Sequence, residues 1–403
     1  MKRILILFAV CLLIFSACGR PAETEKPSEE TSDLFSQLSQ PETDNTDYDA
    51  LFDGFFANLS PNEETDFTFT AENGAATVTS YVGAGGRVRV PDTLDGATVT
   101  AIGNGAFAER DDLEVLILPD TVTDFGIGIL EGTPLTALRT PFPTGEGQGF
   151  LGYLWGAETY RSNNSEALRT LVCLELRRVA SLPDHALFDC NDLVAVRLPD
   201  EMTTVGDYAF SQCARLCSIN TENLIVIGAH TFDSCSALRS LTFGNLLETI
   251  GFAALRDCNG LIELTLPFIG GTREENTYLG YLFGATTPAF SQGFYSPYLC
   301  RVTLTDGCTV LPDFALFECR SLQTIVLPET LTAIGARALS GCTALKKLSL
   351  PTACKTIGDA ACAGCTRLET LENVSFGNIS VGTNAFLGTM LPMLEIEPNP
   401  FND

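Results

Sequence analysis

A short leucine motif that recurs at a near-constant spacing constrains this chain more than any other feature of its sequence. The motif reads Leu-x-x-Leu-x-Leu or close to it, and successive copies are 22 or 23 residues apart except for two steps of 36 and 38. Such a period is typical of repeat proteins, whose units cannot bury their apolar face alone and must stack on their neighbours. We therefore expect a solenoid of about twelve repeat units, here called rungs. The motifs begin at Leu113, Leu135, Leu171, Leu193, Leu216, Leu238, Leu261, Leu299, Leu322, Leu345, Leu368 and Leu391.

Each rung carries the pattern of a short β-strand followed by a tight return. The leucine motif alternates at its end, so its apolar side chains are expected to point inward and the intervening ones outward. Proline often ends the strand, as at Pro199 and Pro328, because it cannot continue a hydrogen-bonded ladder. A pair such as Val205-Gly206 follows, in which glycine permits a tight bend or close packing of neighbouring rungs. We expect a parallel sheet, a right-handed coil and one helical turn at the buried Ala-Phe pair.

The full rung resembles a known repeat. Thr204–Leu216 reads TVGDYAFSQCARL, and the rungs that begin at Ile227-Gly228 and Ile334-Gly335 keep the same spacing of Gly, Cys and Leu. This pattern is similar to the BspA-type leucine-rich repeat of bacterial surface proteins, from about Ala76 to the end of the chain. The resemblance implies a β-rich leucine-rich-repeat solenoid with short helical turns, an N-terminal cap at Thr77–Asp95, and a role in adhesion to host or bacterial surface proteins.

The N-terminus has the features of an export signal. Lys2 and Arg3 precede an apolar stretch over residues 4–14, which is too short to span a bilayer. Phe15–Gly19 resembles the lipobox of bacterial lipoproteins, which implies that Cys18 is the lipid attachment site. We expect residues 1–17 to be a lipoprotein signal peptide and the protein to be anchored to the outer face of the bacterial cell membrane or cell surface, touching the membrane only through its N-terminal lipid.

Composition predicts three further segments. Residues 18–65 are rich in Pro, Ser, Thr and acidic residues and are expected to form a solvated, disordered tether, with a possible short helix at Tyr48–Leu59. Residues 66–112 are expected to form the cap and first turn, and residues 113–403 the solenoid. The net charge of −26 disfavours nucleic acid and anionic lipid headgroups as partners.

Seven cysteines occupy the same position of successive rungs, so we expect them to stack as a ladder inside the coil. Disulfides are common in exported proteins, and a strand spacing of about 5 Å does not exclude them. The position repeats as a small buried one, however, and a free cysteine behaves there as a small hydrophobe. We therefore expect reduced core thiols at Cys190, Cys213, Cys235, Cys258, Cys319, Cys342 and Cys365.

Two long rungs, at 135–170 and 261–298, are the first candidates for function. Their insertions share a segment, Phe150–Ala157 in one and Tyr278–Ala285 in the other, in which Trp155 and Phe283 are expected to fill the core. Insertions in repeat proteins form loops on one face, often the binding one. The outward row of the strands is the alternative surface, and it includes Arg197 and Lys347. The candidate binding residues are Tyr160, Arg161, Asn163, Asn164, Phe290, Phe294, Tyr295, Tyr298, Arg197 and Lys347.

No constellation in the sequence predicts an enzyme. His185 and His230 are the only histidines; both occupy ordinary rung positions and lack metal-ligand spacing. No nucleophile–base arrangement or phosphate loop is evident, and we expect no cofactor and no metal. The sequence favours a surface-anchored lipoprotein that binds an extracellular protein or glycan non-covalently through its solenoid. The alternative is a structural protein of the envelope or biofilm without a single specific ligand.

Overall fold

The structure, a computed structural model, describes residues 48–163, 168–275, 277–373 and 379–392. They form two compact units. The first contains the described residues up to Arg178 together with Asn191–Arg197 and Arg215–Ile219, and the second contains Val179–Cys190, Leu198–Ala214 and the described residues from Asn220 onward. The two units are described separately.

The first unit begins with a small mixed sheet that caps the repeats. Its first two strands form an antiparallel hairpin around Asn73-Gly74, where both residues have a positive φ, as a tight turn requires. The second strand then pairs in parallel with the fifth, so the rung-to-rung ladder already starts inside the cap. The strands are β1 (Phe67–Glu72), β2 (Ala75–Tyr81), β4 (Thr93–Leu94), β5 (Ala97–Ile102) and β7 (Asp124–Phe125).

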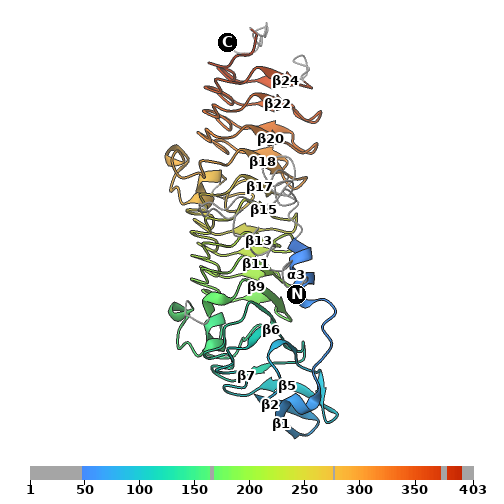
Figure 1. Cartoon of the computed structure of the whole chain (residues 1–403). Helices are drawn as coiled ribbons and strands as arrows, with labels where there is room; N and C mark the ends of the chain where they lie inside the picture. Colours follow the sequence, from blue (N-terminus) through green and yellow to red (C-terminus); the bar gives the residue numbers. More distant parts are fainter. Residues whose placement is uncertain (1–47, 164–167, 276, 374–378, 393–403) are drawn as a thin grey trace, which may run out of the picture. The chain divides into compact units, whose positions relative to one another are not determined.

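A parallel sheet of six strands forms the other face of the first unit (Figure 1). Neighbouring rungs pair in register, with Leu138 opposite Leu174 and Leu174 opposite Val196, so one apolar row points into the coil. The ladder begins before residue 113, within residues 66–112, where the sequence predicts the cap and first turn. In spatial order the strands are β13 (Ser218–Ile219), β11 (Ala195–Arg197), β9 (Cys173–Arg177), β8 (Ala137–Pro141), β6 (Leu113–Ile117) and β3 (Gly86–Arg89).

The second unit repeats this arrangement with two strands in most rungs. The strands of the leucine motif are β15 (Ser240–Thr242), β17 (Glu263–Leu266), β18 (Arg301–Leu304) and β20 (Thr324–Val326) in one sheet, and β22 (Lys347–Ser349) and β24 (Thr370–Glu372) in another. The return strands are β10 (Ser181–Leu182), β12 (Thr204–Val205), β14 (Val226–Ile227) and β16 (Thr249–Ile250), and then β19 (Val310–Leu311), β21 (Ala333–Ile334), β23 (Thr356–Ile357) and β25 (Ser380–Val381). All these pairs are parallel, which confirms the predicted leucine-rich-repeat solenoid.

The Ala-Phe segment forms consecutive turns in place of the expected single helical turn. Tyr208 and Gln212 have φ values of 56° and 65°, and a right-handed helix cannot continue through such residues. Between them, Phe210 is fully buried and its ring stacks on Phe232 of the next rung at 5.5 Å between ring centroids. The turns therefore deliver one large side chain per rung to the core.

Part of the acidic segment 18–65 is folded, and the possible short helix at Tyr48–Leu59 is present. Helix α3 spans Tyr48–Phe56, and the 3-10 turn η1 (Glu64–Asp66) leads into β1. The helix buries Leu51, Phe52, Phe55 and Phe56 against the outward face of the six-stranded sheet, beside β9 and β11 (Figure 1). A helix of this amphipathic pattern gains stability from packing and not from its intrinsic propensity.

The cysteine ladder is buried and none of its seven thiols forms a disulfide, as predicted. The structure adds a reason for cysteine at this position. The thiols of Cys213, Cys235 and Cys258 each donate a hydrogen bond to a carbonyl oxygen of the preceding rung, at S···O distances of 3.2, 3.1 and 3.0 Å. The side chain therefore fills a small buried space and also satisfies a carbonyl group of the turn.

We expect the free energy of unfolding to fall as the pH rises above about 9. Burial raises the pKa of Cys319 to about 12 and also raises that of Cys213. The Cys213 and Cys319 thiols ionise near pH 8.5 in the unfolded chain but stay protonated in the folded one, so the stability that they contribute is complete below pH 8.5 and is lost as the pH rises toward the folded pKa. Urea unfolding at pH 8 and pH 10.5 measures the fall in the free energy of unfolding. This fall should be smaller in the Cys213→Ala variant than in the parent. An equal decline in both chains would contradict this expectation.

Candidate functional site

The two long rungs contain the same structural element, which the shared sequence segment predicted. η2 (Leu151–Trp155) and η5 (Leu279–Phe283) are 3-10 helices that end at Gly156 and Gly284, whose φ values are 82° and 95°. Trp155 and Phe283 are buried, as expected for core residues, and the Trp155 Nε1–H donates a hydrogen bond to the Thr133 carbonyl oxygen at 2.9 Å. The residues that each insertion adds to an ordinary rung therefore lie beyond this buried element.

The described residues of the first insertion expose little apolar surface. It continues through η3 (Tyr160–Ser162), where the Arg161 guanidinium lies 5.7 Å from the centroid of the Tyr160 ring, and η4 (Leu168–Thr170) returns the chain to β9. Asn163 is fully buried, and its Oδ1 accepts a hydrogen bond from the Gly152 N–H at 2.7 Å. The expectation that Asn163 contacts a partner is wrong, because its amide holds the loop closed from inside. Asn164 lies outside the described residues.

The second insertion presents three aromatic side chains to solvent. After η6 (Pro288–Phe290), the exposed fractions are 66% for Phe290, 42% for Phe294 and 62% for Tyr298. Among the side chains that the structure describes, these are the only exposed Phe, Tyr or Trp residues. We call these three residues the aromatic tip. Isolated surface hydrophobics are ordinary, whereas three aromatics within nine residues form a candidate interaction surface.

Tyr295 belongs to the same loop but supports it from below. Its hydroxyl donates a hydrogen bond to the Phe317 carbonyl oxygen at 3.0 Å, and its ring meets that of Phe283 edge to face at 5.7 Å. Burial raises the pKa of this hydroxyl well above its usual value. The prediction that Tyr295 contacts a partner is therefore corrected, since the residue joins the loop to the next rung.

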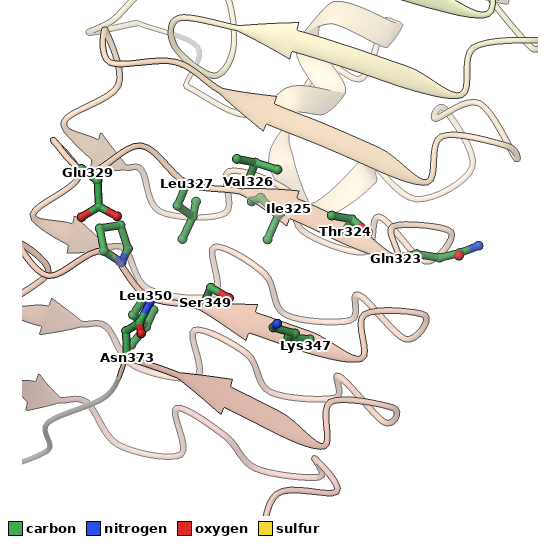
Figure 2. Close-up of a pocket in the computed structure, with 11 residues that line it drawn as sticks. Gln323, Thr324, Ile325, Val326, Leu327, Glu329, Lys347, Ser349, Leu350 and Asn373 are labelled. Carbon is green, nitrogen blue, oxygen red and sulfur yellow. The ribbon is translucent and has the colours of Figure 1, made fainter. Parts of the chain in front are cut away.

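Lys347 lies on the outward row, as predicted, beside a shallow pocket of about 330 Å³ (Figure 2). Its ammonium is 2.6 Å from a Glu372 carboxylate oxygen, and Ser349 donates a hydrogen bond to the same carboxylate at 2.8 Å. Two hydrogen bonds hold the pKa of Glu372 below its usual value, and the one from Lys347 has a larger effect than the one from Ser349. Lys347, Ser349 and Glu372 therefore already satisfy one another at this pocket.

Arg197, which the sequence predicted as a candidate, contacts helix α3 in this structure. Its guanidinium lies 4.1 Å from the centroid of the Phe52 ring of α3 and forms an ion pair with Asp49.

Within residues 48–163, 168–275, 277–373 and 379–392, no group of three or more His, Cys, Asp or Glu residues could hold a metal ion. No helix in these same residues is long and apolar enough to cross a membrane.

The family model of the BspA-type leucine-rich-repeat region matches residues 93–144, 165–276 and 290–400, which is more than half of the chain. The chain belongs to the BspA-type leucine-rich-repeat family. In the BspA-type rungs of this chain, the core is built from the repeated cysteine position and from the Gly-x-x-Ala-Phe turn. The two long rungs carry their insertions in addition to these parts. No protein with curated annotation matches the sequence.

Several solved structures are similar to this BspA-type chain. A leucine-rich-repeat protein from Bacteroides ovatus is 17% identical, with 82% of this chain and 92% of that protein covered and a TM-score of 0.30. A leucine-rich cell surface protein from Faecalibacterium prausnitzii is 15% identical, with 80% and 98% covered and a TM-score of 0.24. The pneumococcal vaccine antigen PcpA is 18% identical, with 84% and 90% covered and a TM-score of 0.32.

Proposed function

We propose that the chain is a cell-surface lipoprotein that binds an extracellular protein or glycan non-covalently, with the aromatic tip as its principal contact. The observation that supports this proposal is the exposure of Phe290, Phe294 and Tyr298 in a chain whose other described aromatic side chains are buried or half-buried. Aromatic side chains bury a large area at low cost in conformational entropy, and they dominate the energetics of protein interfaces.

The loop beneath the aromatic tip is held in place before any partner arrives. Tyr295 ties it to Phe317, and Ser296 Oγ donates a hydrogen bond to the Leu261 carbonyl oxygen at 2.8 Å. A loop that is already ordered loses little conformational entropy on binding, which raises affinity. The described residues of the first insertion form no comparable surface, so the second insertion carries the proposal.

Replacing the aromatic tip with serine (Phe290→Ser, Phe294→Ser and Tyr298→Ser together) is expected to weaken partner binding about 100-fold or more. Loss of two central aromatic contacts typically costs several kcal/mol, and 1.4 kcal/mol corresponds to a factor of ten. Titration of the captured partner measures the loss. The matched control is Arg161→Ser in the first insertion, which should bind like the parent. The proposal fails if the triple variant binds like the parent while its melting curve is unchanged.

The partner is to be found by capture with the purified chain from matrix proteins, mucin and cell-wall polymers. Saturable binding that depends on the aromatic tip is expected for a specific adhesin. Binding that is unsaturable and sensitive to salt would instead favour the structural role in the envelope or biofilm, because non-specific electrostatic contacts weaken as ions screen them.

Cys18→Ala is expected to remove the protein from the membrane fraction or to leave unprocessed precursor, because Cys18 is the proposed lipid acceptor. Cys18 lies outside the described residues, so the prediction rests on the sequence. Metabolic labelling with a fatty acid, followed by fractionation, measures the effect, and Cys11→Ala is the control that should stay anchored. Unchanged membrane partition and lipid label in Cys18→Ala would exclude this site.

A further inference from the structure

Helix α3 is seated on the sheet by matched apolar and charged contacts. Phe52 and Phe56 lie under the guanidinium groups of Arg197 and Arg139, at 4.1 and 4.7 Å from guanidinium carbon to ring centroid. At the C-terminal end of the helix, Arg87 donates hydrogen bonds to the Gly54 and Phe55 carbonyl oxygens. A cation at this end and the acidic Asp49 in the first turn both agree with the helix dipole.

The sheet beneath α3 is apolar at positions where a solvated sheet would be polar. On β8, β9 and β11 the outward residues Ala137, Cys173 and Ala195 are fully buried, each two positions before Arg139, Glu175 and Arg197 on the same face. The corresponding residues of β15, β17, β18, β20, β22 and β24 are mostly Ser, Thr, Glu or Lys, and none is buried. The outward face of the six-stranded sheet in the first unit therefore has the apolar character of a surface that another segment covers.

The charges around this apolar strip favour an acidic segment. Glu175 has a side chain only 4% exposed, and it lies 2.8 Å from the Arg139 guanidinium and 3.8 Å from that of Arg197. The two arginines also face α3, whose charged residues are Asp49 and Asp53. Although the chain has a net charge of −26, arginine side chains therefore lie where its acidic α3 segment docks.

We propose that the outward face of β3, β6, β8, β9 and β11 is a binding surface for an acidic, aromatic amphipathic helix, occupied in cis by α3 as a removable latch. The α3 segment is its occupant, and opening the latch exposes an apolar strip framed by Arg139 and Arg197. This surface is independent of the aromatic tip.

The physical basis for a removable latch is the shortness of the helix. A nine-residue helix is marginal by itself in water, so α3 unfolds when it leaves the sheet. Undocking of α3 breaks none of the strand pairs that join the rungs. A free copy of the segment must compete with the tethered one. Its apparent affinity is its intrinsic affinity multiplied by the fraction of time for which the latch is open.

The test measures binding of a fluorescein-labelled peptide of residues 46–60 to the full chain by anisotropy. The double variant Phe52→Ser with Phe55→Ser, which loosens the latch, is expected to bind the peptide about tenfold or more tightly than the parent does. Adding Arg139→Glu and Arg197→Glu should abolish this gain. The control pair is Arg301→Glu and Lys347→Glu on outward strands of the second unit, which should leave it unchanged.

A loosened variant that binds the peptide no better than the parent, or a gain that survives the arginine reversals, overturns the proposal. Limited chymotrypsin digestion of the unsubstituted chain gives an answer that does not depend on the folding of a variant. Excess unlabelled peptide is expected to speed cleavage within residues 51–56, whose aromatic side chains are buried in the docked state. Cleavage that is equally slow with and without the peptide contradicts a removable latch.

Discussion

Phe210→Ala is expected to lower the free energy of unfolding by about 3–5 kcal/mol, because it truncates one of the largest fully buried side chains. The Phe210 ring stacks on that of Phe232, so truncation leaves a cavity at the centre of two rungs. In a solenoid each rung depends on its neighbours, so the loss should spread to the adjoining rungs. Urea unfolding followed by circular dichroism measures it.

The matched control for Phe210→Ala is Phe290→Ala in the aromatic tip. Phe290 is 66% exposed, so its truncation should change the free energy of unfolding by no more than about 0.5 kcal/mol. The same pair of variants separates the two roles of phenylalanine in this chain: one should lose stability, and the other should lose binding. Equal losses of stability would show that the loop is part of the core.

Gly228→Ala is expected to cost about 3 kcal/mol or more, although it adds only one methyl group. A Cβ at this position would lie 2.5 Å from the Asp207 backbone nitrogen and 2.5 Å from the Gly206 carbonyl carbon. These are backbone atoms of the preceding rung, which cannot move without separating the coil. Of the two roles that the sequence left open for this glycine, the structure therefore supports close packing of neighbouring rungs.

Gly54→Ala is the control of opposite sign. Nothing lies within 4 Å of a Cβ built on Gly54, and the residue is in α3, where alanine is the better helix former by about 1 kcal/mol. Thermal melts of the two variants should therefore shift in opposite directions. Destabilisation by both would mean that α3 packs more tightly around Gly54 than the structure shows.

The sequence was sufficient to predict the rungs because each rung repeats the same local solution. Alternation in the leucine motif determines which side chains point inward, and the repeated position of Cys213 and Cys235 predicts stacking without any knowledge of distances. The likeness of the two insertions similarly identified Trp155 and Phe283 as core residues, which their burial confirms. Local periodicity carries this information, and no long-range contact is needed to extract it.

The contacts that join distant segments were not predictable in the same way. Asn163 and Tyr295 look like exposed loop residues in the sequence, yet their polar groups bind Gly152 and Phe317, and periodicity does not reveal such partners. The docking of α3 had a signal that was available: the helical spacing of apolar residues in Tyr48–Leu59 together with apolar residues at outward strand positions. Neither pattern alone identifies the other as its partner.

The most direct test of the account is a hydrogen–deuterium exchange footprint of the captured partner on the full chain. We predict slower exchange of backbone amides in residues 286–298, around the aromatic tip, with no change in β20, β22 and β24 next to Lys347. Protection of those strands, with residues 286–298 unchanged, would place the partner on the outward sheet and contradict the proposed site.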